Sequence, residues 1–84
     1  MNIIFSQHAL DEMERRNITK EQVISVIENR VQVIELEGKN IYQERITFPN
    51  NKIYLLRVFV NIVVEPNVVI TVYRTSKINK YWIF

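Results

Sequence analysis

The spacing of apolar residues changes once along this chain, and that change limits the folds open to it. Up to Arg30, apolar residues recur at the period of about 3.6 residues that marks an amphipathic helix. After Arg30, apolar and polar residues alternate, which is typical of β-strands with one buried face. The sequence therefore predicts an α+β domain with its helices first and its sheet second.

Two helices are predicted before the change in period. Ser6 is a candidate N-cap for the first helix, which runs to about Arg16 and carries Ala9, Leu10 and Met13 on one face.

The second helix has the clearer start signal. Thr19 and Gln22 have the spacing of a capping box, and the helix should end near Asn29. The side chains predicted to face inward are Val23, Ile24, Val26 and Ile27.

The remainder predicts four strands, within VQVIELEG, IYQERITF, KIYLLRVFVNIVV and VVITVYRT. The connecting turns EGKN, PNN and EPN are short, and short turns join antiparallel neighbours. We therefore expect two N-terminal helices packed on a four-stranded antiparallel meander sheet, as one domain over residues 1–84. The tail SKINKYWIF is compatible with a short helix or with a strand extension.

Two features of the last strands bear on function. Alternation groups Val69, Thr71 and Tyr73 on one face of the last strand and places Arg74 on the other. A face with hydroxyl groups at a strand end suits a cleft better than a core. Arg57 lies among apolar neighbours, so it must reach solvent, meet a carboxylate or hold an anion.

Composition excludes several classes of site. The chain has 84 residues, no cysteine and one histidine, so we expect neither a disulfide framework nor a metal site, and no cofactor. A glycine-rich phosphate loop, a serine nucleophile motif and a carboxylate dyad are all absent from the sequence. No run approaches the roughly 20 apolar residues of a membrane span, and the N-terminus has no signal pattern. These features predict a cytoplasmic protein with no membrane partner.

Charge is distributed unevenly between the two parts of the chain. Residues 1–44 carry five Lys/Arg and eight Asp/Glu, whereas residues 45–84 carry six Lys/Arg and one acid, Glu65. This difference of net −3 against net +5 is either chance in a short chain or a basic surface that attracts phosphates.

His8 is the only side chain that titrates near neutral pH without perturbation. On a helix, Arg15 lies about 20° and Arg16 about 80° around the axis from it. An imidazole between guanidinium groups suits an anion better than a metal. The alternative is an ordinary surface or capping histidine.

The segment TVYRTSKINKYW interleaves cations with aromatic rings. That combination favours single-stranded nucleic acid, because phosphates pair with the cations and bases stack on the rings. The alternative is a basic surface on which Trp82 and Phe84 close a hydrophobic cluster.

The segments FSQHALDEMERRNIT and VVITVYRTSKINKYW resemble a small bacterial family that is catalogued as a domain of unknown function. Its pattern is Phe-Ser-x-His-Ala, then Met, Arg and Gly-Ile-Ser, with a closing Val-Thr-Val-Tyr-Arg. That family is usually placed with RelE/ParE-like toxins, which pack two helices on an antiparallel sheet. Those relatives include ribosome-dependent ribonucleases, gyrase poisons and members without known activity.

The resemblance implies the toxin of a toxin–antitoxin pair, which cleaves RNA without metal by attack of the ribose 2′-hydroxyl. The matching positions are His8, Arg16, Thr71, Tyr73 and Arg74. On that scheme His8 acts as general base or acid, Tyr73 as a second proton donor or stacking platform, and Arg74 as a phosphate clamp. The residues expected to bind nucleic acid are Arg15, Arg16, Arg57, Thr71, Lys77 and Lys80.

The chain departs from the family pattern at two positions. Asn17 replaces a glycine, which is tolerable because asparagine visits the left-handed conformation at helix ends. Glu12 stands where the family often has a basic residue, and its charge weakens phosphate binding near His8.

A second function stays open beside the nuclease, namely a non-catalytic module that binds nucleic acid or a protein such as gyrase. The expected partners are RNA, on or off the ribosome, and an antitoxin; dimerisation through an edge strand is a further option. The nuclease hypothesis requires the imidazole and the Tyr73–Arg74 end of the last strand to share one cleft.

Overall fold

Both N-terminal helices are present and begin at the predicted caps. In the computed structural model, which describes residues 2–84, α1 spans Gln7–Arg16 and α2 spans Lys20–Asn29. The Ser6 hydroxyl accepts a hydrogen bond from the Ala9 amide at 3.0 Å. The capping box is also formed, with Thr19 Oγ1 accepting from the Gln22 amide at 3.1 Å. These caps satisfy amide groups that would otherwise lack partners in the first turn of each helix.

Asn17 ends α1 in the left-handed conformation, with φ at 56°. Its amide donates to the Glu14 carbonyl, and the next amide, of Ile18, donates to the Met13 carbonyl at 2.8 Å. Asparagine therefore supplies the helix end for which the family pattern uses glycine.

Four strands pair antiparallel with their neighbours along the chain, joined by the predicted turns. The strands are β2 (Gln32–Leu36), β3 (Lys39–Thr47), β4 (Ile53–Asn61) and β5 (Asn67–Thr75). The α+β class is confirmed.

The prediction of a four-stranded, wholly antiparallel sheet is wrong. A fifth strand, β1 (Ile3–Phe5), pairs parallel with β5 and makes the sheet mixed, in the order β1-β5-β4-β3-β2. Three residues are too few to show an alternating pattern, and their partner lies at the other end of the chain. Only the folded arrangement therefore identifies them as a strand.

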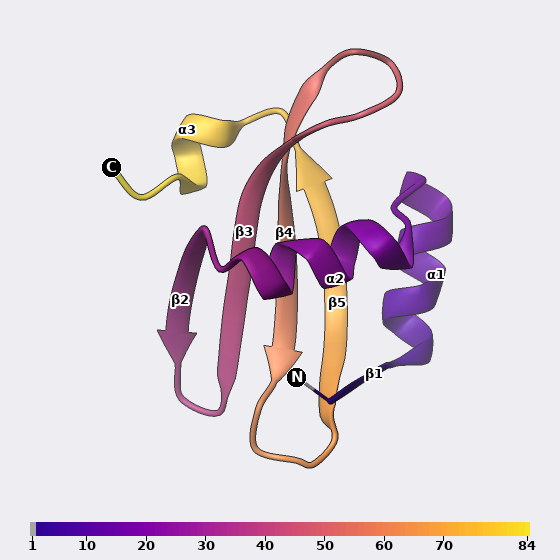
Figure 1. Ribbon diagram of the computed structural model, residues 1–84, viewed down its shortest axis with the longest axis vertical. Coiled ribbons are helices and arrows are strands. Elements are labelled where there is room, and N and C mark those ends of the chain that lie inside the picture. The colour runs from indigo at the N-terminus through magenta and orange to yellow at the C-terminus, as the bar shows by residue number, and fades with distance from the viewer. Residues whose placement is uncertain (1) are drawn as a thin grey trace.

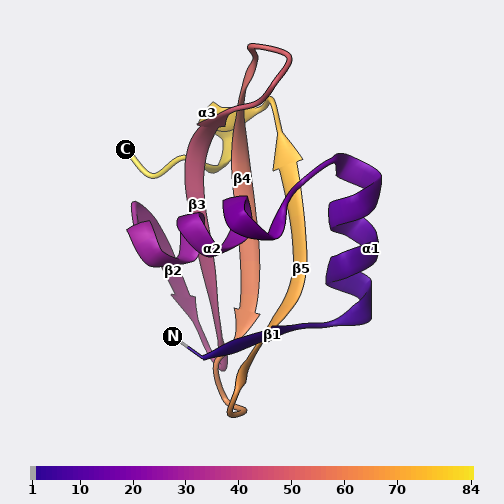
Figure 2. The ribbon, with the colours of Figure 1, turned by 45° about the vertical axis from the view of Figure 1, so that its right-hand side comes forward.

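The helices lie differently with respect to the sheet. Figures 1 and 2 show α2 crossing one face of the sheet and α1 beside β5, just beyond the end of β1. We call the sheet face under α2 the α2 face. The core between helices and sheet is formed by Ala9, Met13, Ile18, Val23, Val26, Ile27, Tyr42, Phe48, Leu56, Val58, Val60, Val69 and Val72. Ile24, which was predicted to face inward, is exposed.

A β-bulge in β5 corrects the predicted alternation. Thr71 lies opposite Phe59, but Val69 lies opposite Val60, so Ile70 is an extra residue in the ladder. An extra residue reverses the inward and outward pattern. Val69 is consequently buried in the core, whereas Thr71 and Tyr73 point to the other side of the sheet.

The C-terminal tail folds back on that other side, which we call the α3 face. A short helix, α3 (Ile78–Tyr81), resolves the choice between helix and strand for the tail. Gln43 Nε2 donates to the Tyr81 carbonyl at 3.0 Å, and Gln32 Nε2 donates to the Ile83 carbonyl at 2.7 Å. The tail therefore covers part of the sheet surface around β2 and β3.

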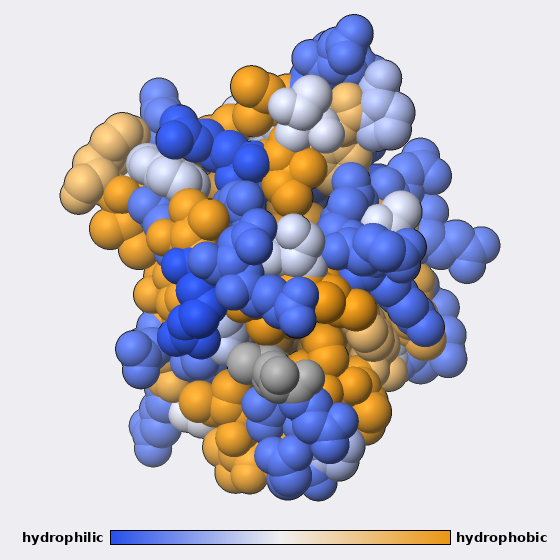
Figure 3. All heavy atoms as spheres, viewed as in Figure 1, coloured by the Kyte–Doolittle hydropathy of each residue, from blue (hydrophilic) through white to orange (hydrophobic). Residues whose placement is uncertain are grey.

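The molecule's surface on the α2 side mixes polar and apolar side chains. Figure 3 shows hydrophilic side chains over α1 and hydrophobic ones exposed between the elements and toward the lower end of the sheet. Among residues 2–84, the helices are all too short and too polar to cross a membrane.

Replacing Thr19 by alanine should lower the free energy of unfolding by about 1 kcal/mol, because it removes the hydroxyl that caps α2. Thr47→Ala is the matched control, since Thr47 is exposed in β3 and should change stability by less than about 0.5 kcal/mol. Urea denaturation followed by circular dichroism measures both. Equal effects of the two variants would contradict the capping role.

Candidate functional site

His8 lies where the start of α1 meets β5. Its Nε2 atom is 3.2 Å from Thr71 Oγ1, and the side chain is 64% exposed. The juxtaposition follows from β1, which pairs with β5 and leads directly into α1. The imidazole is therefore held at one atom by a strand hydroxyl while the rest of the ring stays accessible to a ligand.

Tyr73 and Arg74 do not share a cleft with His8 as a pair. In the β4–β5 register, Tyr73 lies opposite Arg57 on the α3 face, and Arg74 lies opposite the buried Leu56 on the α2 face. Adjacent residues in a strand project to opposite sides of the sheet. Tyr73 thus lies on the same face as Thr71, and Arg74 lies on the other. The expectation of one cleft around all three side chains is wrong for Arg74.

Arg57 is the charged group at the centre of the α3 face. It is only 8% exposed, its Nε donates to Gln43 Oε1 at 2.9 Å, and its Nη1 donates to the Tyr73 hydroxyl at 2.6 Å. The Tyr81 ring lies 4.4 Å from the guanidinium carbon. A buried cation is costly unless polar groups and aromatic faces replace its water.

No carboxylate balances that charge within residues 2–84, where every ion pair involves Glu12. Of the three outcomes expected for Arg57, pairing with a carboxylate is therefore excluded for the described residues. Neutral groups hold the guanidinium in place, so its positive charge is not neutralised by a side chain among the described residues.

Aromatic side chains surround this cation on the α3 face. The Phe59 and Tyr73 rings stack with centroids 6.1 Å apart, and Tyr81 meets Tyr73 edge to face. One face of the Trp82 ring is covered by the Arg45 guanidinium, whose carbon lies 4.3 Å from the ring centroid. Lys77, which precedes α3, and Lys80, which lies within it, are both exposed. The tail is thus both a hydrophobic cover and a source of surface cations.

Glu12 forms ion pairs with the arginines of α1. Its carboxylate pairs with both Arg15 and Arg16 and lies 3.9 Å from His8 Nε2. The hydrogen bond from Arg15 lowers the pKa of Glu12 below its usual value of 4.5. Arg15 and Arg16 are therefore partly neutralised and less available to phosphate than their sequence positions indicate.

The pKa of the Tyr81 hydroxyl, like that of Glu12, is lowered. The main cause is its hydrogen bond with Tyr73, and the hydrogen bond and charge of Lys80 and the charge of Arg57 lower it further below its usual value of 10.0. The phenols of Tyr73 and Tyr81 and the Arg57 guanidinium therefore form one polar cluster.

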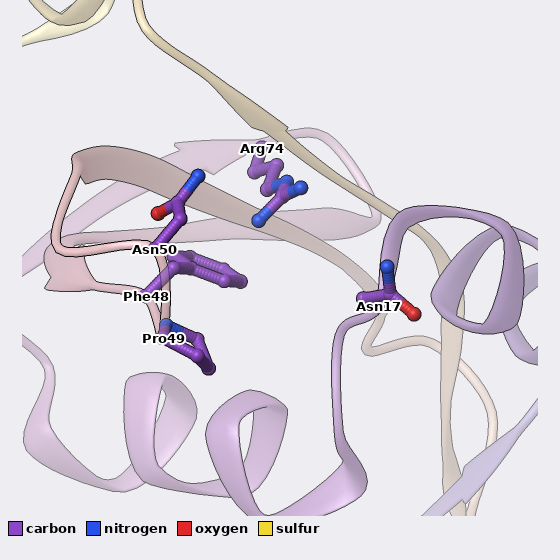
Figure 4. A pocket seen from close by; sticks show the side chains of 5 residues that line it. All are labelled: Asn17, Phe48, Pro49, Asn50 and Arg74. Atoms are coloured by element: carbon purple, nitrogen blue, oxygen red, sulfur yellow. The ribbon is translucent and has the colours of Figure 1, made fainter.

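Arg74 lines a separate cavity on the α2 face. The cavity has a volume of about 440 Å³, and Figure 4 shows Arg74 extending into it. Its lining residues are Asn17, Phe48, Pro49, Asn50 and Arg74. Residues 2–84 contain no group of three or more His, Cys, Asp or Glu side chains placed to hold a metal ion.

Sequence reasoning missed Gln43, which anchors both Arg57 and the tail. Its signal was present in the hairpin register, since Gln43 lies opposite Arg57. For the cavity residues Phe48, Pro49 and Asn50, the sequence predicts only the end of a strand and a turn. Nothing in their local pattern indicates that the end of α1 approaches them.

Residues 5–74 match DUF4258, a family described as a domain of unknown function. The chain belongs to this family. The DUF4258 match runs from β1 to Arg74, so it includes His8 and Tyr73 but not the tail that carries α3. A search of the curated proteins and of the solved structures finds no match to the chain.

In this DUF4258 domain, Tyr73→Phe should lower the free energy of unfolding by about 1–3 kcal/mol, because the buried Arg57 guanidinium loses the half-buried hydroxyl that accepts from it. It should also raise the pKa of Tyr81 toward 10.0, since Tyr73 is the main cause of its lowering. A lowered folded-state pKa contributes stability that is present above pH 10 and lost as the pH falls through the folded value.

Denaturation measures the first effect of Tyr73→Phe, and tyrosinate absorbance against pH measures the second. Tyr54→Phe is the control, because the Tyr54 hydroxyl accepts from Asn50 on the α2 face. An unchanged Tyr81 titration in Tyr73→Phe would show that the phenols are not coupled.

Proposed function

We propose that this domain binds single-stranded RNA at the rim where α1 meets β5 and cleaves it without metal, as a toxin of the RelE/ParE-like type. The observation that carries the proposal is the approach of His8 to Thr71. It brings an exposed imidazole to the edge of a face that holds stacked aromatic rings and the uncompensated charge of Arg57.

The binding step uses the rings and cations of the α3 face. Phe59 is half-buried, lies opposite Thr71 and stacks with Tyr73, which puts an aromatic surface next to His8. A base stacked there sets its phosphate near the imidazole, and Lys77 and Lys80 attract the continuing backbone. The positive charge of Arg57 acts over the same surface.

The cleavage step is intramolecular transesterification. The ribose 2′-oxygen attacks the adjacent phosphorus as its proton passes to the imidazole, and the bond to the 5′-oxygen breaks as that oxygen takes a proton from a water molecule. His8 is the general base, and Thr71 orients its ring. The charge of Arg57 stabilises the phosphorane. Arg74 has no part in this scheme, because it lies on the other face.

The resemblance to toxins extends the proposal to an antitoxin partner. Within residues 2–84, β2 is an outer strand that pairs only with β3, so its second edge offers backbone groups to a strand from a partner chain or a second copy.

A second candidate is RNA binding without cleavage, favoured by Glu12. Its carboxylate lies 3.9 Å from His8 Nε2. A negative group beside the imidazole repels the scissile phosphate and weakens its approach to His8.

Expression of the wild-type chain should slow growth and fragment cellular RNA, and His8→Ala should abolish both effects. Loss of a general base lowers the cleavage rate by about 10²–10⁴-fold. Gln7→Ala is the matched control, since Gln7 is exposed one position earlier and bonds only Asp11. If the wild type and His8→Ala are equally harmless and equally inactive on purified RNA, the nuclease is disproved.

Glu12→Gln should strengthen binding of single-stranded RNA, because it releases the guanidinium groups of Arg15 and Arg16. The slope of log affinity against log salt should steepen by up to about 0.7 for each additional phosphate contact. Glu14→Gln makes the same charge change at an exposed residue of α1 that has no ion pair among residues 2–84. Equal gains from both variants would mean that net charge, not release of the arginines, sets the affinity.

A further inference from the structure

Arg74 lies between two aromatic rings on the α2 face, on the other side of the sheet from Thr71 and Tyr73. Its guanidinium carbon lies 4.4 Å from the Phe48 ring centroid and 4.5 Å from that of Tyr54. These two rings meet edge to face at 5.3 Å. Contact with two aromatic side chains restricts the guanidinium to few orientations. Binding of a ligand to it therefore loses little side-chain conformational entropy.

The N–H groups of the Arg74 guanidinium have no acceptor among residues 2–84. Within residues 2–84 the Arg74 side chain makes neither a hydrogen bond nor an ion pair, in contrast to Arg57, which bonds Gln43 and Tyr73. A guanidinium presents five N–H groups in a fixed plane and keeps its charge at every physiological pH. Its geometry matches an oxyanion.

The cavity in front of Arg74 has room for a small molecule. Its volume of about 440 Å³ lies within the usual range for ligand sites. The end of α1, the β3–β4 turn and the end of β5 enclose it (Figure 4). Arg74 is the one charged residue in its lining, so the lining carries net positive charge.

Asn17 supplies a second polar group. Asn50 already donates to the Tyr54 hydroxyl and accepts from the Lys52 amide. The Asn17 side chain, by contrast, has no hydrogen-bond partner among residues 2–84 and lines the cavity from α1. The negative charge at the C-terminal end of α1 is weakened, because the Glu14 and Met13 carbonyls already accept backbone hydrogen bonds.

We propose that this cavity binds a small phosphate monoester, of the class of a nucleoside monophosphate. Two phosphate oxygens bind the Arg74 fork, and the third accepts from the Asn17 amide. Phe48 and Pro49 provide the apolar wall for the organic part. A carboxylate has only two oxygens, which the fork satisfies alone, so the additional donor favours phosphate.

The test is a titration of the ¹⁵N-labelled full chain with adenosine monophosphate, followed through the Arg74 Nε–H and Asn17 side-chain amide signals. Both signals should shift to saturation. Arg74→Gln should weaken binding by about tenfold or more, as loss of a charge-assisted bidentate contact does. Asn17→Gly keeps the left-handed helix end and should weaken adenosine monophosphate but not acetate.

Two controls separate this site from other cations and from the RNA function. Arg45→Gln removes a stacked arginine from the α3 face, and His8→Gln removes the proposed base; both should bind adenosine monophosphate like the wild type. Absence of shifts at Arg74 and Asn17 would overturn the proposal. So would acetate binding as tightly as adenosine monophosphate, or equal losses in Arg74→Gln and Arg45→Gln.

Discussion

The pairing of β1 with β5 is the interaction on which the rest of the arrangement depends. Three residues, Ile3–Phe5, join the last long strand in parallel, and the ladder continues where the Ser6 amide donates to the Val69 carbonyl at 3.0 Å. The Ser6 hydroxyl also donates to the Ile70 carbonyl while it caps α1. One residue thereby ends the strand, begins the helix and fixes both to β5. The first turn of α1 then lies against Thr71, which is why the two ends of the sequence meet at the candidate site.

The bulge at Ile70 decides which side chains belong to that site. Because it reverses the alternation of β5, Val69 enters the core while Thr71 and Tyr73 project to the α3 face. Arg74 then falls on the α2 face with the helices. Two adjacent residues, Tyr73 and Arg74, therefore serve two separate surfaces on opposite sides of the sheet. The proposed RNA surface and the proposed phosphate cavity share a strand but no side chain.

The arginines of α1 and the arginines of the sheet have different kinds of partner. On α1, Glu12 gathers Arg15 and Arg16, so the first helix contributes little free positive charge. On the sheet, Arg57 and Arg74 lie against aromatic rings without a carboxylate partner among residues 2–84. The hydrophobic cluster predicted for Trp82 and Phe84 is not formed: Trp82 packs against the Arg45 guanidinium, and Phe84 is 93% exposed. Lys77 and Lys80 are exposed as well.

The sequence by itself determined the local elements of this protein, because caps, periodicity and turns act between near neighbours. Ser6 and Thr19 start the helices, and the alternation after Arg30 gives the four strands β2, β3, β4 and β5. Only the tertiary structure decided the rest. Four features join residues that are far apart in the chain or differ by one position in register: β1, the bulge at Ile70, the hydrogen bond from Arg57 to Gln43, and the cavity between Asn17 and Arg74. Local patterns do not encode such contacts, since they arise from the packing of complete elements against one another.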